Sequence, residues 1–267
     1  MKFLFLNTKR DRTALLVFLL FYFCFGTFLY FFQEKIIYQP YPQDFASCQG
    51  FLSAEKTDYN GTRMYFKNNG PKAVVFYHGN AGSACDRSYL ADIFENFGYS
   101  FIVPEYAGYS NDDTKPSNES VKKDAEHVVG FLSEHDFSEI IVAAESIGTG
   151  AGSYHVSLDK PDKLLFISPF SSLLDVAGTK FWFYPLSLML DNAFVNADLL
   201  KNFDGKTMLI HGDKDDIIPI KFGKKLFEKI NSKNKEFVII KGAGHNDIFT
   251  FQESYEALYG FLKAGAK

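Results

Sequence analysis

The sequence predicts an α/β fold in which helices flank a mostly parallel central sheet. The first observation is a series of short apolar runs, rich in β-branched and aromatic residues, each of strand length. The second is that stretches of helical length separate these runs, as expected when crossover helices join parallel strands. The alternation starts near residue 51 and continues to the end of the chain. We therefore expect one domain over residues 51–267.

The predicted strands begin with an antiparallel pair and continue as a parallel series. The opening pair is FLSAEKT and TRMYFKN. The later strands are AVVFYHG, SFIVPEY, EIIVAAES, KLLFIS, TMLIHG and EFVIIKG. The helices expected between and after them are ACDRSYLADIFENFG, SNESVKKDAEHVVGFLSEH, IGTGAGSYHV, IKFGKKLFEKI and QESYEALYGFLK.

The alternation is interrupted over residues 169–203, a stretch too long for an ordinary loop. This stretch is apolar and contains Trp182, the only tryptophan of the chain. We expect a lid-like segment that covers a pocket. The alternative is that its apolar residues pack on the sheet or dip into a nearby bilayer.

An uncharged apolar stretch, ALLVFLLFYFCFGTFLYFF, covers residues 14–32. Its length is close to the roughly 20 residues that a helix needs to cross a bilayer. A cleaved signal peptide is the alternative, but its apolar region is usually only about 7–15 residues and ends at a small-residue cleavage site. Since no such site follows here, we expect an uncleaved transmembrane signal-anchor helix over residues 14–32.

The charges around this stretch predict its orientation. Lys2, Lys9, Arg10 and Arg12 precede it, whereas only Lys35 follows it closely. The positive-inside rule then places residues 1–13 in the cytoplasm and the folded domain on the non-cytoplasmic side of the membrane.

Residues 33–50 lie between the anchor and the domain. They include YQPYPQDF, in which two prolines disfavour regular structure. A juxtamembrane linker is expected there.

The composition excludes nucleic acid as a partner. With 28 basic and 32 acidic side chains, the net charge is −4. The sequence therefore lacks the basic excess that is typical of nucleic-acid-binding proteins.

The pairing of two cysteines is not decided by the sequence. Cys48 and Cys85 would face an oxidising compartment in the predicted orientation and could form a disulfide. Two unpaired thiols are the alternative. The glycosylation sequons NGT at Asn60 and NES at Asn118 are short enough to arise by chance.

Ser146 lies among small residues in the stretch VAAESIGTGAG. It follows a predicted strand and precedes a predicted helix, which is the context of a nucleophile elbow. The usual elbow motif is G-x-S-x-G, and Ala144 replaces its first glycine here. The pattern indicates a serine nucleophile for acyl transfer.

A serine nucleophile needs a general base, and in elbow proteins the chain order is serine, acid, histidine. Three histidines follow Ser146. His155 falls inside the helix after the elbow, and His211 ends a buried strand. His245 lies in the glycine-rich loop KGAGHND after the last strand, so we predict it as the base.

The third member of the site is an acid that orients the base. Asp213, Asp215 and Asp216 all lie in HGDKDDIIP after a predicted strand. Their spacing alone does not choose among them.

An oxyanion hole is expected from backbone N–H groups that face the nucleophile. The glycine-rich turn in FYHGNAGS follows the first parallel strand. The expected donors are Ile147, next to the nucleophile, and Asn80 or Ala81 in this turn. The alternative is an ordinary glycine turn without a role in catalysis.

With these motifs in place, the chain resembles the α/β-hydrolase superfamily, and in particular membrane-anchored members similar to the α/β-hydrolase-domain protein depalmitoylases. The motifs YHGNAGS, PEYAGYS with KPSNES, AESIGT, SPFSSLLDVA, HGDKDDIIP and GAGHND follow the family's order across roughly residues 73–247. The resemblance implies the α/β-hydrolase fold. It also implies Asp215 as the acid, because the family's H-G-x-x-D-x-x-x-P pattern falls on this residue, with Ser146 as nucleophile and His245 as base.

The function implied is a serine hydrolase that cleaves carboxylic ester or thioester bonds through an acyl-enzyme, without a metal or cofactor. A lid over the site would favour lipophilic acyl substrates. The depalmitoylases lack this anchor, so their substrate is not carried over. A serine peptidase or amidase on the same fold is one alternative, and a catalytically inactive membrane-tethered binding protein is the other.

Overall fold

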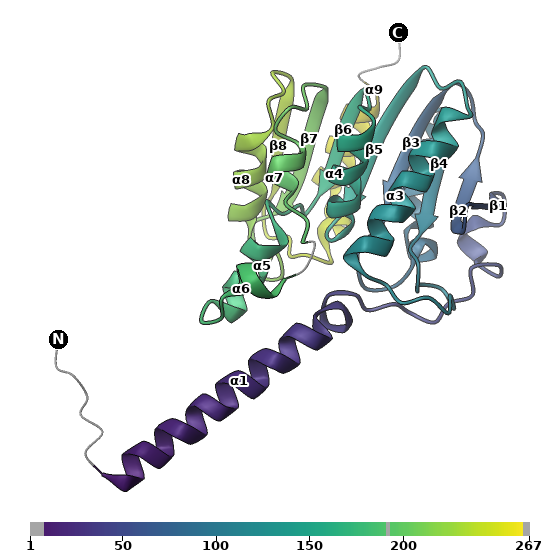
Figure 1. Ribbon diagram of the computed structural model, residues 1–267. Coiled ribbons are helices and arrows are strands. Elements are labelled where there is room, and N and C mark those ends of the chain that lie inside the picture. Colours follow the sequence, from purple (N-terminus) through teal and green to yellow (C-terminus); the bar gives the residue numbers. More distant parts are fainter. Residues whose placement is uncertain (1–7, 191–192, 264–267) are drawn as a thin grey trace.

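The computed structural model describes residues 8–190 and 193–263 (Figure 1). The described strands are β1 Glu55–Tyr59, β2 Thr62–Lys67, β3 Lys72–Tyr77, β4 Ser100–Glu105, β5 Glu139–Glu145, β6 Lys163–Ile167, β7 Lys206–Gly212 and β8 Lys235–Ile240. The described α-helices are α1 Lys9–Ile37, α2 Ser88–Asn96, α3 Asn118–Ser133, α4 Gly148–Leu158, α5 Leu173–Phe181, α6 Leu186–Met189, α7 Asn196–Leu199, α8 Ile220–Lys229 and α9 Gln252–Lys263. The described 3₁₀ helices are η1 Gln49–Phe51, η2 Ala84–Arg87 and η3 Ile248–Thr250.

The sheet has the strand order β1-β2-β4-β3-β5-β6-β7-β8. β2 pairs antiparallel with β1 and with β4, and every pair from β4 to β8 is parallel. The predicted opening pair and the predicted parallel series are therefore confirmed. After β3 the chain adds β4 on one side and then crosses to β5 on the other. In open α/β sheets, ligands bind beyond the carboxyl ends of the strands at such a switch point.

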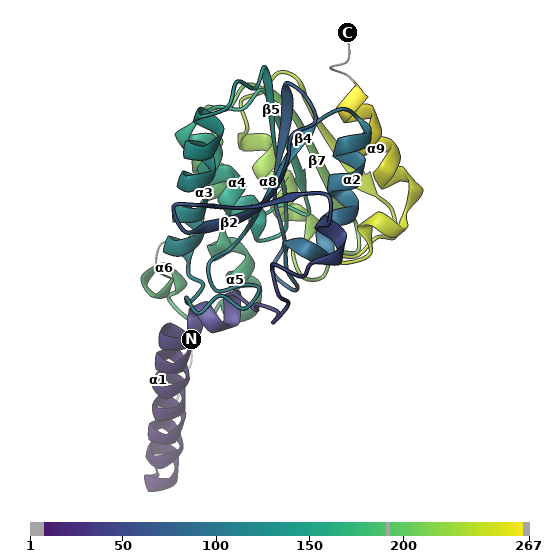
Figure 2. The same cartoon turned by 90° about the vertical axis from the view of Figure 1, so that its right-hand side faces the viewer.

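Helices cover both faces of the sheet (Figure 2). On one face, Val128 of α3, Ala151 of α4 and Leu226 of α8 belong to one buried cluster. On the other face, Phe94 of α2 and Leu258 of α9 belong to a second. The central strands are buried from both sides, which explains why they read as continuous apolar runs rather than as alternating patterns.

The N-terminal helix α1 projects away from the domain (Figure 1). Thr8 caps its first turn by accepting from the Asp11 N–H, and the helix ends at Ile37. It therefore contains the predicted span of residues 14–32 and extends beyond it at both ends. Its length of 29 residues and the mean hydropathy of 2.3 over its most apolar 18 residues suit a membrane-crossing helix.

The segment expected as a juxtamembrane linker differs from that expectation. Residues 33–37 continue α1, and the chain after Tyr38 packs on the domain instead of hanging free. The Tyr38 side chain is buried, and its hydroxyl donates to Asn118 Oδ1 over 2.7 Å. Phe45 is buried as well, and its carbonyl accepts from the Tyr65 hydroxyl over 2.9 Å. The prolines prevent regular structure here, but aromatic side chains still fix the segment.

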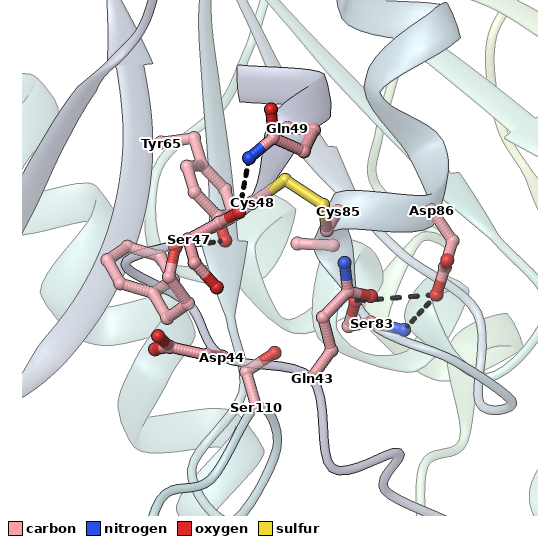
Figure 3. Close-up of a disulfide and its surroundings, with 12 residues drawn as sticks. Gln43, Asp44, Ser47, Cys48, Gln49, Tyr65, Ser83, Cys85, Asp86 and Ser110 are labelled. Carbon is pink, nitrogen blue, oxygen red and sulfur yellow. Dashed lines mark hydrogen bonds between the residues drawn. A yellow bond between two sulfur atoms is a disulfide. The ribbon is translucent and has the colours of Figure 1, made fainter. Parts of the chain in front are cut away.

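A disulfide between Cys48 and Cys85 completes this attachment (Figure 3). It joins the segment after α1 to η2, which follows the glycine-rich turn. In this structure the alternative of two unpaired thiols does not hold. The bond closes a loop over a sequence separation of 37 residues, so it restricts the unfolded chain and thereby stabilises the fold.

The stretch predicted as lid-like contains the short helices α5, α6 and α7. The first two lie on the side of the domain from which α1 projects (Figures 1 and 2). The Tyr184 ring, between α5 and α6, stacks on the Tyr22 ring of α1 with 4.5 Å between centroids. The lid-like stretch therefore contacts the N-terminal helix as well as the domain.

Candidate active site

Ser146 lies in the sharp turn between β5 and α4, with a φ of 54°. Left-handed backbone is costly for a residue with a side chain, and such strain is concentrated at functional sites. The turn needs a small neighbour as well. A Cβ at Gly148 would lie 2.4 Å from the carbonyl oxygens of Tyr77 and His78, so only glycine fits there.

Ala144, which replaces the first glycine of the usual elbow motif, fits without displacing its surroundings. Its side chain is fully buried under α4. The residue above it is Gly152, where an added Cβ would lie 3.2 Å from the Ala144 methyl group. The missing side chain of Gly152 leaves the room that Ala144 uses, so the departure from the motif does not distort the turn.

Ser146, His245 and Asp215 form a continuous chain of hydrogen bonds. His245 Nε2 lies 2.8 Å from Ser146 Oγ, and His245 Nδ1 lies 2.7 Å from Asp215 Oδ2. An ionised carboxylate only accepts, so Nδ1 carries the proton and donates it to Asp215. Nε2 is then free to accept from the serine hydroxyl. This is the arrangement of a nucleophile, its base and an orienting acid.

Asp215 is held by several donors besides His245. Its Oδ1 accepts from the N–H groups of Ile217 and Ile218 over 3.0 and 2.7 Å. His211 Nε2 lies 3.3 Å from Oδ2 and 2.8 Å from the Ile218 carbonyl oxygen. Burial alone would raise the pKa of the Asp215 carboxyl, but the hydrogen bonds from His211 and His245 hold it well below its usual value. The side chain therefore stays a carboxylate.

The other acids of the triplet do not reach the base. Asp213 and Asp216 are both exposed. Asp213 Oδ1 accepts from the Gly242 N–H over 2.7 Å and so fixes the turn that leads to His245. The sequence could not decide which of the three carboxylates contacts His245. In the structure it is Asp215.

The remaining downstream histidines have other surroundings. His155 is buried in α4, where its Nδ1 lies 2.8 Å from the Tyr77 hydroxyl. Burial lowers its pKa to about 3, so the ring is neutral. His211 Nε2 contacts the same Asp215 oxygen as His245 and so supports the carboxylate. Chain order had already favoured His245 over both.

The predicted oxyanion donors line the same cavity as Ser146. Ile147 is the residue at the start of α4, and Asn80 and Ala81 follow β3. The Asn80 side chain is already engaged, because its Oδ1 accepts from the Gln39 N–H over 2.8 Å and its Nδ2 donates to the Ile37 carbonyl over 2.5 Å. Any contribution of Asn80 to an oxyanion hole would therefore come from its backbone N–H.

Arg87 and Glu145 form a further part of the site that sequence reasoning missed. The guanidinium donates to both carboxylate oxygens, over 3.1 and 3.2 Å, and also to the Ala81 carbonyl over 3.0 Å. Glu145 immediately precedes Ser146, so this ion pair links the Ala81 turn to the turn that carries Ser146. The acidic residue Glu145 next to Ser146 was the available signal in the sequence. No local pattern identified Arg87 as its partner.

An apolar cavity of about 450 Å³ leads to Ser146. Four parts of the chain form its walls: the end of α1, the turn after β3, helices α5 and α6, and the loops that carry Ser146, Asp215 and His245. The apolar lining includes Leu29, Ile36, Phe170, Leu173, Val176, Ala177, Phe181, Leu186 and Met189. The cavity can hold a hydrophobic chain whose reactive end lies at the serine. Among the described residues, no cluster of histidine, cysteine and acidic side chains could hold a metal ion.

No protein-family model matches the chain. Among curated proteins, it is 26% identical over 204 residues to α/β-hydrolase domain-containing protein 17B of Xenopus tropicalis, covering 73% of this chain and 67% of the relative. It is 26% identical over 207 residues to a protein of Saccharomyces cerevisiae named as an uncharacterised membrane protein, covering 73% and 72%. It is 22% identical over 241 residues to the lysophosphatidylserine lipase ABHD12 of Danio rerio, covering 79% and 63%.

Solved structures show the same architecture. An esterase of Pyrococcus furiosus matches with a TM-score of 0.64 and 17% identity, over 80% of this chain and 91% of that one. A monoacylglycerol lipase of Paleococcus ferrophilus matches with a TM-score of 0.58 and 14% identity, over 76% and 98%. At these identities the likeness concerns the fold, and it covers most of the domain.

Proposed function

We propose that this chain, which has the α/β-hydrolase fold, is a membrane-anchored serine hydrolase that cleaves carboxylic ester or thioester bonds of lipophilic acyl substrates. The fold and the resemblance predicted from the sequence are confirmed by the relatives and the solved structures. The observation that carries the proposal is the chain of hydrogen bonds from Ser146 through His245 to Asp215 beside the apolar cavity.

The proposed reaction has two steps. In the first, His245 Nε2 takes the proton of Ser146 Oγ as the oxygen attacks the acyl carbonyl carbon. The negative charge of the tetrahedral intermediate develops where backbone N–H groups of Ile147 and of Asn80 or Ala81 can donate to it. The intermediate collapses when His245 gives the proton to the leaving alcohol or thiol, which leaves the acyl group on the serine.

In the second step, water replaces the leaving group. His245 takes a proton from the water as its oxygen attacks the acyl-enzyme, and then returns the proton to Ser146 Oγ as the carboxylic acid leaves. Asp215 stays ionised throughout and stabilises the imidazolium that forms in each step. The low pKa of this carboxyl suits the role.

The lining of the cavity supports an acyl chain rather than a peptide as the substrate. Its walls are mostly aliphatic and aromatic side chains. The names of the relatives and of the structures with the same fold point the same way, since they include lipases and an esterase. The peptidase or amidase and the inactive binding protein remain the alternatives. Assays of acyl esters beside peptide amides separate them.

We expect kcat/KM for p-nitrophenyl acyl esters to rise several-fold with each added carbon until the cavity is full. Each buried CH₂ contributes about 0.8 kcal/mol to binding, which is roughly a fourfold factor. The full-length chain in detergent micelles would be assayed with esters of two to sixteen carbons below their own micelle concentrations. A flat profile, or one highest for acetate, would leave a small-ester hydrolase.

A matched pair of variants in α5 locates the acyl site. Ala177 lines the cavity, so Ala177→Phe should shift the optimum to shorter esters. Its neighbour Gly178 faces open space and does not line the cavity, so Gly178→Ala should leave the profile unchanged. Equal effects of both variants would mean that the acyl chain binds elsewhere.

The orientation of the protein is part of the proposal. We propose that α1 spans the membrane with residues 1–13 in the cytoplasm and residues 51–267 on the other side. The charge asymmetry around α1 supports this orientation, and so does the Cys48–Cys85 disulfide, since such bonds persist in oxidising compartments.

Glycosylation in endoplasmic-reticulum microsomes tests the orientation. Asn60 is exposed in the β1–β2 turn, so we expect a glycan there that the Asn60→Asp variant loses. Asn118 is buried, with its side chain accepting from Tyr38, and should stay unmodified in the folded protein. An unglycosylated product that integrates into the microsomal membrane would contradict the orientation.

A further inference from the structure

We propose that residues 181–190 of the lid-like stretch are embedded in the hydrocarbon layer beside α1, so that the protein contacts lipid through two elements. This inference rests on the proposed role of α1 as a membrane span and goes beyond it. It assigns lipid acyl chains as the partner of an exposed apolar surface. Its support lies in the depth at which the two elements meet, in the contacts between them and in the character of the outer surface.

The charges of α1 fix its position in a bilayer. The helix carries no charge between Arg12 and Glu34, and at 1.5 Å per residue this interval matches a hydrocarbon layer of about 30 Å. Tyr22 lies close to the middle of the interval, roughly 16 Å along the helix from Gln33. Whatever packs against Tyr22 from the side therefore lies at the depth of the lipid tails.

The turn between α5 and α6 packs against α1 at this depth. The Tyr22 hydroxyl donates to the Phe183 carbonyl over 2.8 Å, and the Tyr184 hydroxyl donates to the Tyr22 carbonyl over 2.8 Å. One turn further along α1, an added Cβ at Gly26 would lie 2.8 Å from the Tyr184 ring. Glycine at position 26 therefore lets this ring approach the helix.

Polar side chains of α1 satisfy backbone groups of the lid-like stretch. In lipid, an irregular segment is tolerated only where its N–H and C=O groups find partners within the protein. The carbonyl of Phe183 lies in the turn after α5 and that of Met189 at the end of α6. They accept from the Tyr22 hydroxyl and from Gln33 Nε2, the latter over 3.0 Å. The N–H groups of residues 184, 186, 188 and 190 bond within the segment. In water, solvent molecules would satisfy the two carbonyl groups, and hydrogen bonds from α1 would not be needed.

The exposed surface of residues 181–190 is apolar. Trp182 is 78% exposed, Leu188 is 80% exposed and Phe183 is 46% exposed. The run FWFYPLSLML, which covers residues 181–190, contains no charged residue. Soluble domains seldom expose large apolar side chains in such a group, whereas lipid tails would cover them at no cost. Ring contacts lead from Trp182 through Phe183 and Tyr184 to Tyr22 of α1, so this surface adjoins the helix.

This placement has a consequence for the active site. Residues of α1 and of α5 and α6 form one end of the cavity that leads to Ser146. If α1 and the lid-like helices are embedded in lipid, an acyl chain reaches Ser146 from within the bilayer instead of through water. The substrates would then be membrane lipids that keep their chains in the leaflet during the reaction.

Trp182 is the only tryptophan of the chain, so its fluorescence reports this surface alone. The full-length protein would be reconstituted into phosphatidylcholine vesicles, with integration verified by alkaline carbonate extraction. We expect lipids brominated on their acyl chains to quench most of the emission, and aqueous acrylamide to quench little of it. The signal needs no turnover, so ester hydrolysis measured on the same sample can succeed or fail independently.

A relocated tryptophan provides the control. Leu158 is 44% exposed at the C-terminal end of α4, which lies toward the amino ends of the strands, whereas Ser146 lies at their carboxyl ends. The double variant Trp182→Phe, Leu158→Trp should be quenched by acrylamide and not by brominated lipid. If Trp182 behaves like this control in carbonate-resistant protein, the proposal is wrong. If neither agent quenches Trp182, the lipid assignment is overturned. Acrylamide quenching that returns on dilution in excess lipid would then show that a second copy of the chain covers the surface.

Discussion

Replacing Ser146 with alanine should lower kcat for ester hydrolysis by roughly 10⁶ and leave the fold intact. The hydroxyl is the only nucleophile that the structure brings to His245 Nε2 among the described residues. The activity that remains would reflect binding and oxyanion stabilisation alone. The fold should survive because the Ser146 N–H keeps its hydrogen bond to the Ile167 carbonyl, and alanine needs no more space than serine.

Ser168 offers a matched control for this variant. It also follows a central parallel strand, is buried and has a positive φ, here of 47°. Its Oγ has no hydrogen-bond partner among the described residues. Ser168→Ala should therefore change kcat by no more than a few-fold. Single-turnover kinetics on both variants, with thermal unfolding recorded in parallel, would separate lost chemistry from lost structure. Near wild-type turnover by Ser146→Ala would refute the assignment of the nucleophile.

The second large effect is expected at Asp215, where replacement by asparagine should lower kcat by about 10⁴. An amide that directs its NH₂ group at His245 Nδ1 would favour the tautomer with the proton on Nε2. That tautomer cannot accept the serine proton. The amide of the Asp215→Asn variant would also present a donor to His211 where the carboxylate accepts. The loss should appear in kcat more than in KM, because the acyl cavity is unchanged.

Asp213→Asn and Asp216→Asn serve as controls within the same loop. Both side chains are exposed and neither contacts His245, so their kcat values should stay near that of the unchanged protein. The depressed pKa of Asp215 means that its charge stabilises the fold at neutral pH, and that this contribution is lost as pH falls through the folded-state pKa. Thermal unfolding at neutral pH must therefore accompany the kinetics. Equal losses of kcat at all three positions would show that the loop's stability, not catalysis, is being measured.

The sequence predicted most of the fold because local patterns specify most of its elements. The central strands are buried on both faces, so each appears as a short apolar run between amphipathic helices. That Ser146 and His245 lie together was predictable, because a turn among small residues and a glycine-rich loop at a strand end are local signals. Asp215 could not be separated from Asp213 and Asp216 by spacing, since the distance to His245 depends on how two distant loops meet.

Other features depend on contacts that no local pattern records. The prolines after residue 38 correctly disfavoured helix and strand, but they could not show that Tyr38 and Phe45 anchor the segment to the domain. The ion pair between Arg87 and Glu145 joins residues 58 positions apart. Likewise, the partners of Tyr22 lie more than 160 residues along the chain. Pairings over such separations are decided by tertiary structure.

Labelling with a fluorophosphonate probe tests the central claim most directly, because such a probe reacts only with a serine activated by a neighbouring base. The full-length protein would be treated with the probe, digested and analysed by mass spectrometry. We predict a single adduct on the peptide that contains Ser146, lost in Ser146→Ala, strongly slowed in Asp215→Asn and retained in Ser168→Ala. An unlabelled, folded protein, or an adduct on another serine, would contradict the account.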